Sequence, residues 1–241
     1  MFTGIGTLAN VAAILGGGMI GLICKGGLKP RLQETIIHTL GLSTIFIGAG
    51  GALSHFLVIE NGALTTSDSL SMILSLVLGT LLGEVCDFEG KLERFGQWLK
   101  KQASRGEDNR FVEGFVTASL VVCIGAMAIV GALQDALLGD PSTLFTKSIL
   151  DFMSVLIFTS TYGKGAMFSA IPVAILQGSV TIFAVFLNPI FSAGVIATLS
   201  FIGSILIFCV GINLAFGNHF RVANMLPALI LGPVFTSFIP L

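Results

Sequence analysis

The chain has 241 residues, of which 54% are hydrophobic and only 10% are charged. Soluble domains carry roughly a quarter charged residues, so this composition indicates a membrane protein. The formal net charge of −1, without a large basic patch, argues against a nucleic-acid partner.

Charge-free stretches predict the membrane spans, because a helix needs about 20 apolar residues to cross the hydrocarbon core. We expect eight spans, or seven if the weak fifth segment is a re-entrant loop. The expected spans are Thr3–Cys24, Thr35–Ile59, Ser69–Val85, Phe111–Leu133, Thr146–Gly163, 166–187, 191–215 and Val222–Pro240. The predicted fold is thus all-α, a polytopic transmembrane helix bundle that forms one domain over residues 1–241.

The distribution of lysine and arginine predicts the orientation of the chain. With the N-terminus outside, eleven of the twelve basic residues fall on the inner side, and only Lys147 falls outside. The longest inner segment, 87–110, has apolar residues at helical spacing from Phe88 to Leu99, with Trp98 beside them. This pattern predicts an amphipathic helix that lies in the headgroup layer.

Two stretches of the chain repeat a pattern at a distance. Ser154–Phe158 followed by Ile171–Leu176 parallels Ser204–Phe208 followed by Leu226–Leu231. Short apolar patterns also recur by chance in membrane proteins, so a true duplication into helical hairpins is one of two open interpretations. Internal repeats are common in transporters, which place their binding site where the repeats meet.

Polar and small residues fall on one face of three expected spans. The three faces are Thr3, Thr7, Asn10, Gly17 and Gly21; Ser148, Asp151, Val155, Thr159 and Tyr162; and Ser169, Val173, Gln177 and Thr181. Inside lipid a polar side chain needs a partner or water, so such a face can line a path for a solute. Alternatively, it packs one helix against another, as small-x3-small pairs such as Gly17 and Gly21 commonly do.

Two carboxylates, Asp135 and Asp151, flank the connection between the fourth and fifth spans. An ionisable group at membrane depth marks function unless it is solvated at the end of a loop, and both interpretations stay open. The turn Thr159–Gly165 places Lys164 between two glycines, which predicts either an anion-binding concavity or a tight inner loop. The candidate residues for contact with a solute or ion are Asp135, Asp151, Tyr162, Asn10, Gln177, Gln134, Ser148, Thr159 and Asn213.

No sequence motif predicts an enzyme. The chain lacks HExxH and GxSxG, its three histidines are far apart in the sequence, and its four cysteines form no CxxC. We therefore expect no catalytic residues, no metal and no cofactor, although distant residues can assemble an intramembrane active site.

Several motifs are similar to those of an uncharacterised bacterial membrane family called domain of unknown function 554. The motifs are Arg110–Ser119, Gly125–Asp135, Gly139–Thr143, Lys147–Asp151 and Arg221–Ala228, with Asn10 and Gly83-Glu84 similar as well. The resemblance covers essentially the whole chain. It implies a multispan protein of the bacterial cytoplasmic (inner) membrane, and it brings no activity or substrate with it.

We expect a small multispan transporter or channel for a small polar or ionic solute. Its expected partners are the lipid bilayer, the solute or ion, and a second copy of the chain bound through the glycine faces. The first alternative is a scaffold or sensor that acts through the helix at 89–110 without transport. The second is an intramembrane enzyme that acts on lipid. The sequence names neither the solute nor the coupling ion.

Overall fold

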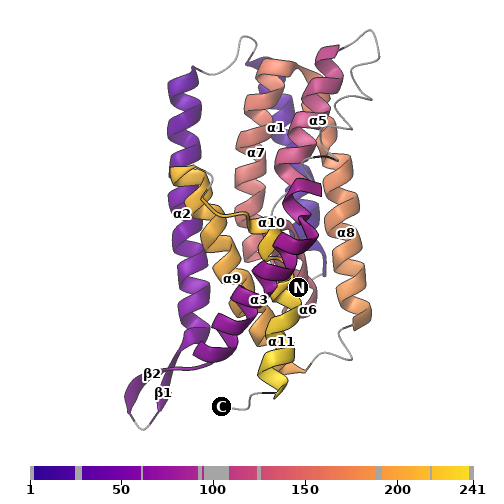
Figure 1. Ribbon diagram of the computed structural model, residues 1–241. Helices are drawn as coiled ribbons and strands as arrows, with labels where there is room; N and C mark the ends of the chain where they lie inside the picture. Colours follow the sequence, from indigo (N-terminus) through magenta and orange to yellow (C-terminus); the bar gives the residue numbers. More distant parts are fainter. Residues whose placement is uncertain are drawn as a thin grey trace. The chain divides into compact units, whose positions relative to one another are not determined.

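A computed structural model describes residues 3–24, 29–60, 62–91, 94, 109–123, 126–187, 192–217 and 219–238 (Figure 1). The described chain is almost entirely helical, so the prediction of an all-α polytopic bundle is confirmed. The helices are α1 Ile5–Ile23, α2 Pro30–Phe56, α3 Ser69–Cys86, α5 Asn109–Cys123, α6 Ala126–Leu137, α7 Ser142–Tyr162, η1 Lys164–Ser169, α8 Ala170–Leu187, α9 Ala193–Phe216, α10 Val222–Met225 and α11 Ala228–Phe238.

One short hairpin departs from the all-helical expectation. Strands β1, Leu57–Glu60, and β2, Ala63–Thr66, pair antiparallel directly after α2. The residues that begin β1 favour strands, and the connection has the sequence Asn-Gly, with Gly62 at a φ of 79°. That is the turn chemistry of a two-residue β-hairpin. The second helix therefore ends at Phe56, three residues before the expected end of the span.

Six described helices are long and apolar enough to cross a membrane, and a seventh is reached if a bent pair counts as one span. The bent pair is Thr117–Cys123 with Met127–Leu137, whose axes differ by 50°. The expected eighth span is represented by two shorter helices, α10 and α11, which are separated at Pro227. A proline at that position lacks the N–H that a continuous helix needs.

The interruption of a membrane helix lies in the expected fourth span and not in the fifth, where the sequence analysis considered a re-entrant loop. The fifth segment was predicted as a span, with a re-entrant loop as the alternative, and it forms the continuous 21-residue helix α7, which begins at Ser142 rather than Thr146. The break instead falls within the expected fourth span, between α5 and α6. A helix that ends inside the bundle leaves its last carbonyl groups without intrahelical partners.

The chain divides into two compact units built from alternating parts of the sequence. Unit 1 comprises Met1–Ile36 and Gly90–Phe186, and unit 2 comprises Ile37–Glu89 and Leu187–Leu241. Each unit contains a long helix, a short helix and another helix in succession, α7-η1-α8 in unit 1 and α9-α10-α11 in unit 2. This shared order is compatible with the duplication hypothesis, which stays a prediction, as does the description of the chain as one domain.

In unit 1, glycines bring α1 and α7 together at backbone distance. A Cβ atom placed on Gly21 would lie only 2.6 Å from the carbonyl oxygen of Leu156, and one on Gly17 would collide with the carbonyl of Phe152. Residue numbers rise together along this contact, so the two helices are parallel. The helix-packing interpretation of the Gly17–Gly21 pair is thus confirmed.

A second backbone-level contact in unit 1 joins α5 to η1. A Cβ on Gly165 would collide with the carbonyl of Phe111. Between these two tight pairs lies a small apolar core, formed by Ile14, Val122, Val155, Ala170 and Val173. Four helices of the unit, α1, α5, α7 and α8, contribute to it.

Unit 2 uses glycines in the same manner with antiparallel helices. A Cβ on Gly41 of α2 would lie 2.5 Å from the amide nitrogen of Ala215 in α9. A Cβ on Gly79 of α3 would lie 2.5 Å from the amide nitrogen of Ala228 in α11. The glycines of α1, α2 and α3 therefore pack against helices of the same chain. Association with a second copy stays a prediction, and it would need another surface.

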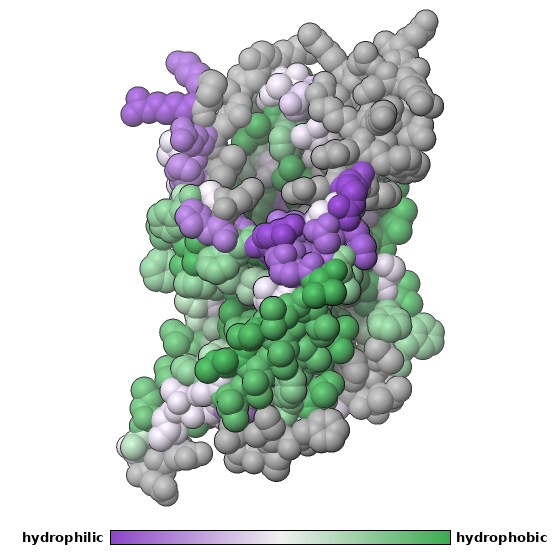
Figure 2. Space-filling view, in the orientation of Figure 1, coloured by the Kyte–Doolittle hydropathy of each residue, from purple (hydrophilic) through white to green (hydrophobic). Residues whose placement is uncertain are grey.

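A charged cluster lies where α3 ends and α10 begins. The guanidinium of Arg221 contacts Glu84 at 2.7 Å and Asp87 at 3.2 Å, with about half of the arginine side chain exposed. Figure 2 shows a hydrophilic patch in this region, bordered by the apolar surface of α3, where Val85 is 85% exposed. Such a border between apolar and charged surface is typical of a membrane–water interface.

The predicted amphipathic helix falls largely outside the described residues. Of the segment 87–110, the structure describes residues up to Lys91, Arg94, and the start of α5 at Asn109. The described beginning of the segment is helical, and its interfacial position stays a prediction.

Candidate functional site

The three polar faces predicted from the sequence are buried in the same unit. Apart from exposed Thr3 and half-buried Tyr162, every residue of the three faces is buried. The faces belong to α1, to α7, and to η1 with α8, and all of these elements lie in unit 1. Helical periodicity therefore identified the inward sides of three helices that turn out to share one interior.

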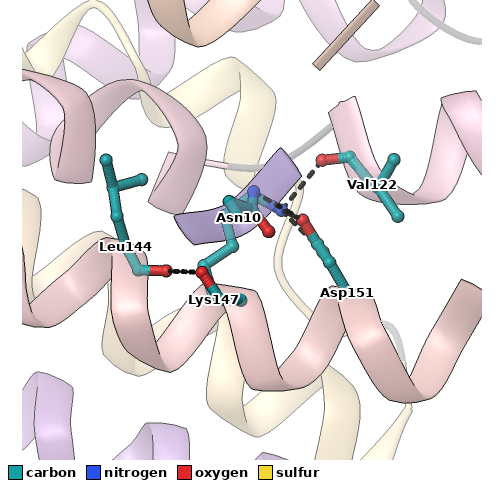
Figure 3. Close-up of polar contacts among 6 residues, drawn as sticks. Asn10, Val122, Leu144, Lys147 and Asp151 are labelled. Carbon is teal, nitrogen blue, oxygen red and sulfur yellow. Dashed lines mark hydrogen bonds and ion pairs between the residues drawn. The ribbon is translucent and has the colours of Figure 1, made fainter. Parts of the chain in front are cut away.

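A buried ion pair on α7 forms the centre of this interior (Figure 3). The ammonium nitrogen of Lys147 lies 2.8 Å from both carboxylate oxygens of Asp151, one helical turn further along. Lys147 is 5% exposed and Asp151 is 4% exposed. Lys147, which the orientation analysis counted on the outer side, is a buried helix residue whose side chain turns into the helix packing and neutralises the carboxylate. The orientation itself stays a prediction.

The same ammonium also contacts the broken helix. Lys147 Nζ donates to the carbonyl oxygen of Val122 at 2.8 Å, and Figure 3 shows this carbonyl pointing into the cluster. In a continuous helix the Val122 carbonyl would accept from the amide four residues later, but α5 ends at Cys123. The C-terminal end of a helix carries partial negative charge, so it favours a cation at this position.

Helix α1 contributes a neutral partner. The amide nitrogen of Asn10, a fully buried residue, donates to Asp151 Oδ2 at 2.9 Å. The carboxylate thus receives hydrogen bonds from two side chains on two helices. The cluster of Asn10, Val122, Lys147 and Asp151 is called the ion-pair cluster below.

Asp135 lies in α6 and contacts the start of α1. Its Oδ2 accepts from the amide of Gly6 at 3.0 Å, and the residue is 1% exposed. A carboxylate at a helix N-terminus is stabilised by the unpaired amides there. Both Asp135 and Asp151 are buried, so the alternative that they are solvated loop-end carboxylates is wrong. The two do not bond to one another.

Seven buried residues in unit 1 carry side-chain polar atoms that make no hydrogen bond within the described protein. They are Thr7, Asn10 through Oδ1, Ser119, Thr159, Ser169, Gln177 and Thr181. Leaving a buried polar group unpaired costs about 1–3 kcal/mol, so such groups normally indicate water or a bound molecule. Gln177 is the extreme case, since it is fully buried and both of its amide atoms are unpaired.

Contacts of η1 and α8 with the two ends of α1 place Gln177 between those ends. Met167 packs on Gly18, and Thr181 packs on Gly4 at the other end of α1. Met167 belongs to η1 and Thr181 to α8, so the chain from η1 to α8 runs antiparallel to α1, and Gln177 lies between these two contacts as Asn10 does on α1. The unpaired amide of Gln177 and Asn10 of the ion-pair cluster therefore both lie away from the ends of unit 1's helices.

The remaining candidates make local contacts. Gln134 accepts from the hydroxyl of Thr143 at 2.6 Å, and Ser148 donates to the carbonyl of Leu144 on its own helix at 2.7 Å. The Tyr162 ring lies beside Phe158, with centroids 6.4 Å apart.

Asn213 lies in unit 2, where it closes the turn after α9. Its Oδ1 accepts from the amides of His219 and Phe220, both at 2.9 Å, and its Nδ2 donates to the carbonyl of Phe220. All of these partners are in the turn, so the structure does not bring Asn213 together with the other candidates.

The turn around Lys164 follows from packing. Gly163 has a φ of 87°, a conformation that favours glycine, and Gly165 is needed for the contact with α5. Lys164 is exposed. These observations favour the tight-loop interpretation over an anion-binding concavity.

Sequence reasoning missed Lys147 and the Val122 carbonyl. The signal for Lys147 was its spacing of four residues from Asp151, which places the two side chains on one helix face. The break that frees the Val122 carbonyl had only a weak signal, namely Gly125 in an apolar run. Across the residues that the structure describes, no group of three or more His, Cys, Asp or Glu side chains could hold a metal.

Comparison with known proteins gives a family match over nearly the whole chain. The profile of the family described as "Protein of unknown function (DUF554)" matches residues 5–237. The "Uncharacterized membrane protein YdfK" of Bacillus subtilis (strain 168) is 30% identical over 232 residues, which are 95% of this chain and 94% of the relative. The "Uncharacterized protein YqgA" of Escherichia coli (strain K12) is 29% identical over 234 residues, 94% of each chain. No solved structure matches.

Proposed function

We propose that this chain, which belongs to the DUF554 family as its motifs predicted, is a membrane transporter for a small polar or ionic solute. The family brings no activity with it, so the proposal depends on the structure of the site. The proposal places the solute path in unit 1, along the inward faces of α1, α7 and α8. A location in the membrane is supported independently of this proposal, because a relative is described as a membrane protein and the chain has several apolar helices.

The observation that carries the proposal is the set of unpaired buried polar atoms in the unit that also contains the buried ion pair. A membrane bundle that only needs to pack can fill its interior with apolar side chains at no such cost. Here a fully buried Gln177 has neither a donor nor an acceptor partner in the described protein. A bound solute or water that enters between the helices would satisfy these groups.

The broken helix supports the same proposal. Transporters commonly bind substrate or coupling ions at discontinuous helices, where helix ends offer unpaired backbone groups. The end of α5 at Val122 is such a place, and it faces the carboxylate of Asp151 through Lys147. The scaffold or sensor alternative depends on the segment 87–110, most of which lies outside the described residues.

Cysteine labelling in membrane vesicles tests whether water and small polar molecules reach this interior. In a variant without the four native cysteines, Gln177→Cys and Thr181→Cys should react with a small, membrane-impermeant methanethiosulfonate reagent. The matched control is Ile175→Cys on the same helix, whose native side chain is 67% exposed on the surface that we assign to lipid. It should not react, because its thiol cannot ionise in hydrocarbon.

Two outcomes contradict the proposal. If Gln177→Cys and Thr181→Cys stay unreactive from both sides of the membrane, the interior is dry and no solute path exists there. Equal reactivity of the Ile175→Cys control would mean that the helix is not embedded as proposed. A panel of ions and small polar solutes in proteoliposomes then identifies the cargo, with Asp151→Asn as the variant expected to abolish uptake.

A further inference from the structure

The hydrogen-bond partners of the Lys147 ammonium in the described contacts are all oxygen atoms, and the position that the ammonium fills is called the seat below. Three oxygens lie 2.8 Å from its nitrogen, two from the Asp151 carboxylate and one from the Val122 carbonyl. Carboxylate and carbonyl oxygens are the ligands that hard metal cations prefer. The seat combines a full negative charge with the negative end of a helix dipole, so its chemistry suits a cation other than an ammonium equally well.

From this geometry we infer that the seat is a binding site for a monovalent alkali cation, with Lys147 acting as a tethered cation that the mobile ion replaces. Lysine carries a compact charge on a flexible four-carbon stem, so the ammonium can leave the seat without movement of the α7 backbone. One cation leaves and one enters, and the charge within the seat is unchanged.

Asn10 acts as a positioning residue in this exchange. Its amide donates to Asp151 Oδ2 at 2.9 Å. Because this bond does not involve Lys147, we expect it to hold the carboxylate in place when the ammonium leaves. The neighbouring elements offer no competing charge in the described contacts. Helix α1 supplies the neutral Asn10, α5 supplies the Val122 carbonyl with the Cys123 thiol next in sequence, and the carboxylate of Asp135 on α6 is bonded to Gly6.

The inference names the ion for the proposed transporter, yet its test measures binding and does not depend on flux. The thermal unfolding midpoint of the purified full-length protein is followed during titration with NaCl, LiCl and KCl. N-methyl-D-glucamine chloride keeps the ionic strength constant, because that organic cation is too large for the seat. The variants are Lys147→Met, which empties the seat, and Lys147→Met with Asp151→Asn, which also removes its charge.

We expect the midpoint of Lys147→Met to rise saturably with at least one alkali cation. The wild type should respond at least tenfold more weakly in apparent affinity, because its own ammonium competes. The double variant should not respond at all. A response that is equal in the single and double variants would overturn the inference, since it would not involve the Asp151 carboxylate.

Other results also decide the question. A midpoint of Lys147→Met that depends on pH but on no alkali cation means that a proton takes the seat, which overturns the inference. If Lys147→Met does not fold, Lys147→Gln replaces it, because an amide can still donate to Val122 without a charge. If neither folds, we expect the wild type to bind at least one of ²²Na⁺ and ⁸⁶Rb⁺, a radioactive substitute for potassium, saturably, and Asp151→Asn to lose that binding. Absence of saturable binding of both ions is decisive against the site. Failure of the labelling experiment above leaves this binding result standing, so the two proposals can fail separately.

Discussion

Lys147 precedes Asp151 by one turn on α7, and its ammonium lies 2.8 Å from both oxygens of that buried carboxylate and 2.8 Å from the Val122 carbonyl on α5. One side chain thus links two helices and neutralises a charge that the interior could not hold alone. Asn10 adds α1 to the same contact. The predictions below follow from this relationship and from the packing around it.

The ion pair should be strongly coupled in stability. Removing one partner of a buried pair leaves an uncompensated charge and costs about 3–5 kcal/mol. We therefore expect Lys147→Met to lower the free energy of unfolding by that amount in buffer free of alkali cations. The double variant Lys147→Met with Asp151→Asn should recover most of the loss. A double-mutant cycle measured in mixed micelles checks this, and additive losses would contradict it.

Gly21 should tolerate no larger residue. A Cβ there would lie 2.6 Å from the Leu156 carbonyl, so Gly21→Ala must push α1 away from α7, at a cost of about 1–3 kcal/mol in the free energy of unfolding. Gly178→Ala on α8 is the matched control, because no atom lies within 4 Å of its added Cβ. The control should be neutral or stabilising by up to about 1 kcal/mol, since alanine favours helix. Equal effects would show that α1 and α7 are not in close contact.

Gln177→Leu should separate function from stability. Because the amide has no partner in the described protein, its removal should leave the free energy of unfolding unchanged or raise it by about 1–3 kcal/mol. Solute uptake should nevertheless be lost if the amide contacts the cargo. Gln134→Leu is the contrasting variant. It removes the acceptor of the Thr143 hydroxyl and should destabilise by about 1 kcal/mol. A large loss of stability in Gln177→Leu would show that the amide is bonded.

In unit 2, replacing the neutral Asn224 should cost more stability than replacing the charged Arg221. Arg221 makes two ion pairs, but the groups are about half exposed, so Arg221→Gln should cost less than about 1 kcal/mol and depend on salt. Asn224 is neutral and fully buried, and its Oδ1 accepts from the Glu89 amide at 2.8 Å. Asn224→Ala should therefore cost about 1–3 kcal/mol and be insensitive to salt. Chemical denaturation at two salt concentrations distinguishes the two variants.

Periodicity and charge explain what could be read from the sequence. The inward faces of α1, α7 and α8 were predictable because a membrane helix with polar residues at a spacing of three and four has one polar side. The fold class followed from the length of the apolar runs. Lys147 was missed because lysine serves as a loop marker in topology prediction, although its spacing from Asp151 offered the pairing.

Contacts between distant parts of the chain could not be read in this way. The ion pairs of Arg221 with Glu84 and Asp87 cross more than 130 residues of sequence. The break between α5 and α6 has no proline to mark it, and its effect on the Val122 carbonyl depends on where α7 packs. Such features depend on tertiary packing, which a single sequence does not encode locally.

The glycine contacts of unit 1 have a mechanical consequence. They bring α1 against α7 and α5 against η1 at backbone distance, so we expect each pair of helices to move as one body. The two pairs are joined covalently at Gly163, whose φ of 87° marks the end of α7, through the apolar core around Ile14 and Val122, and by the hydrogen bond from Lys147 to Val122. If the two pairs move apart about Gly163, the contact between Lys147 and Val122 must open. The cation at that position, whether ammonium or alkali ion, then holds α5 and α7 together.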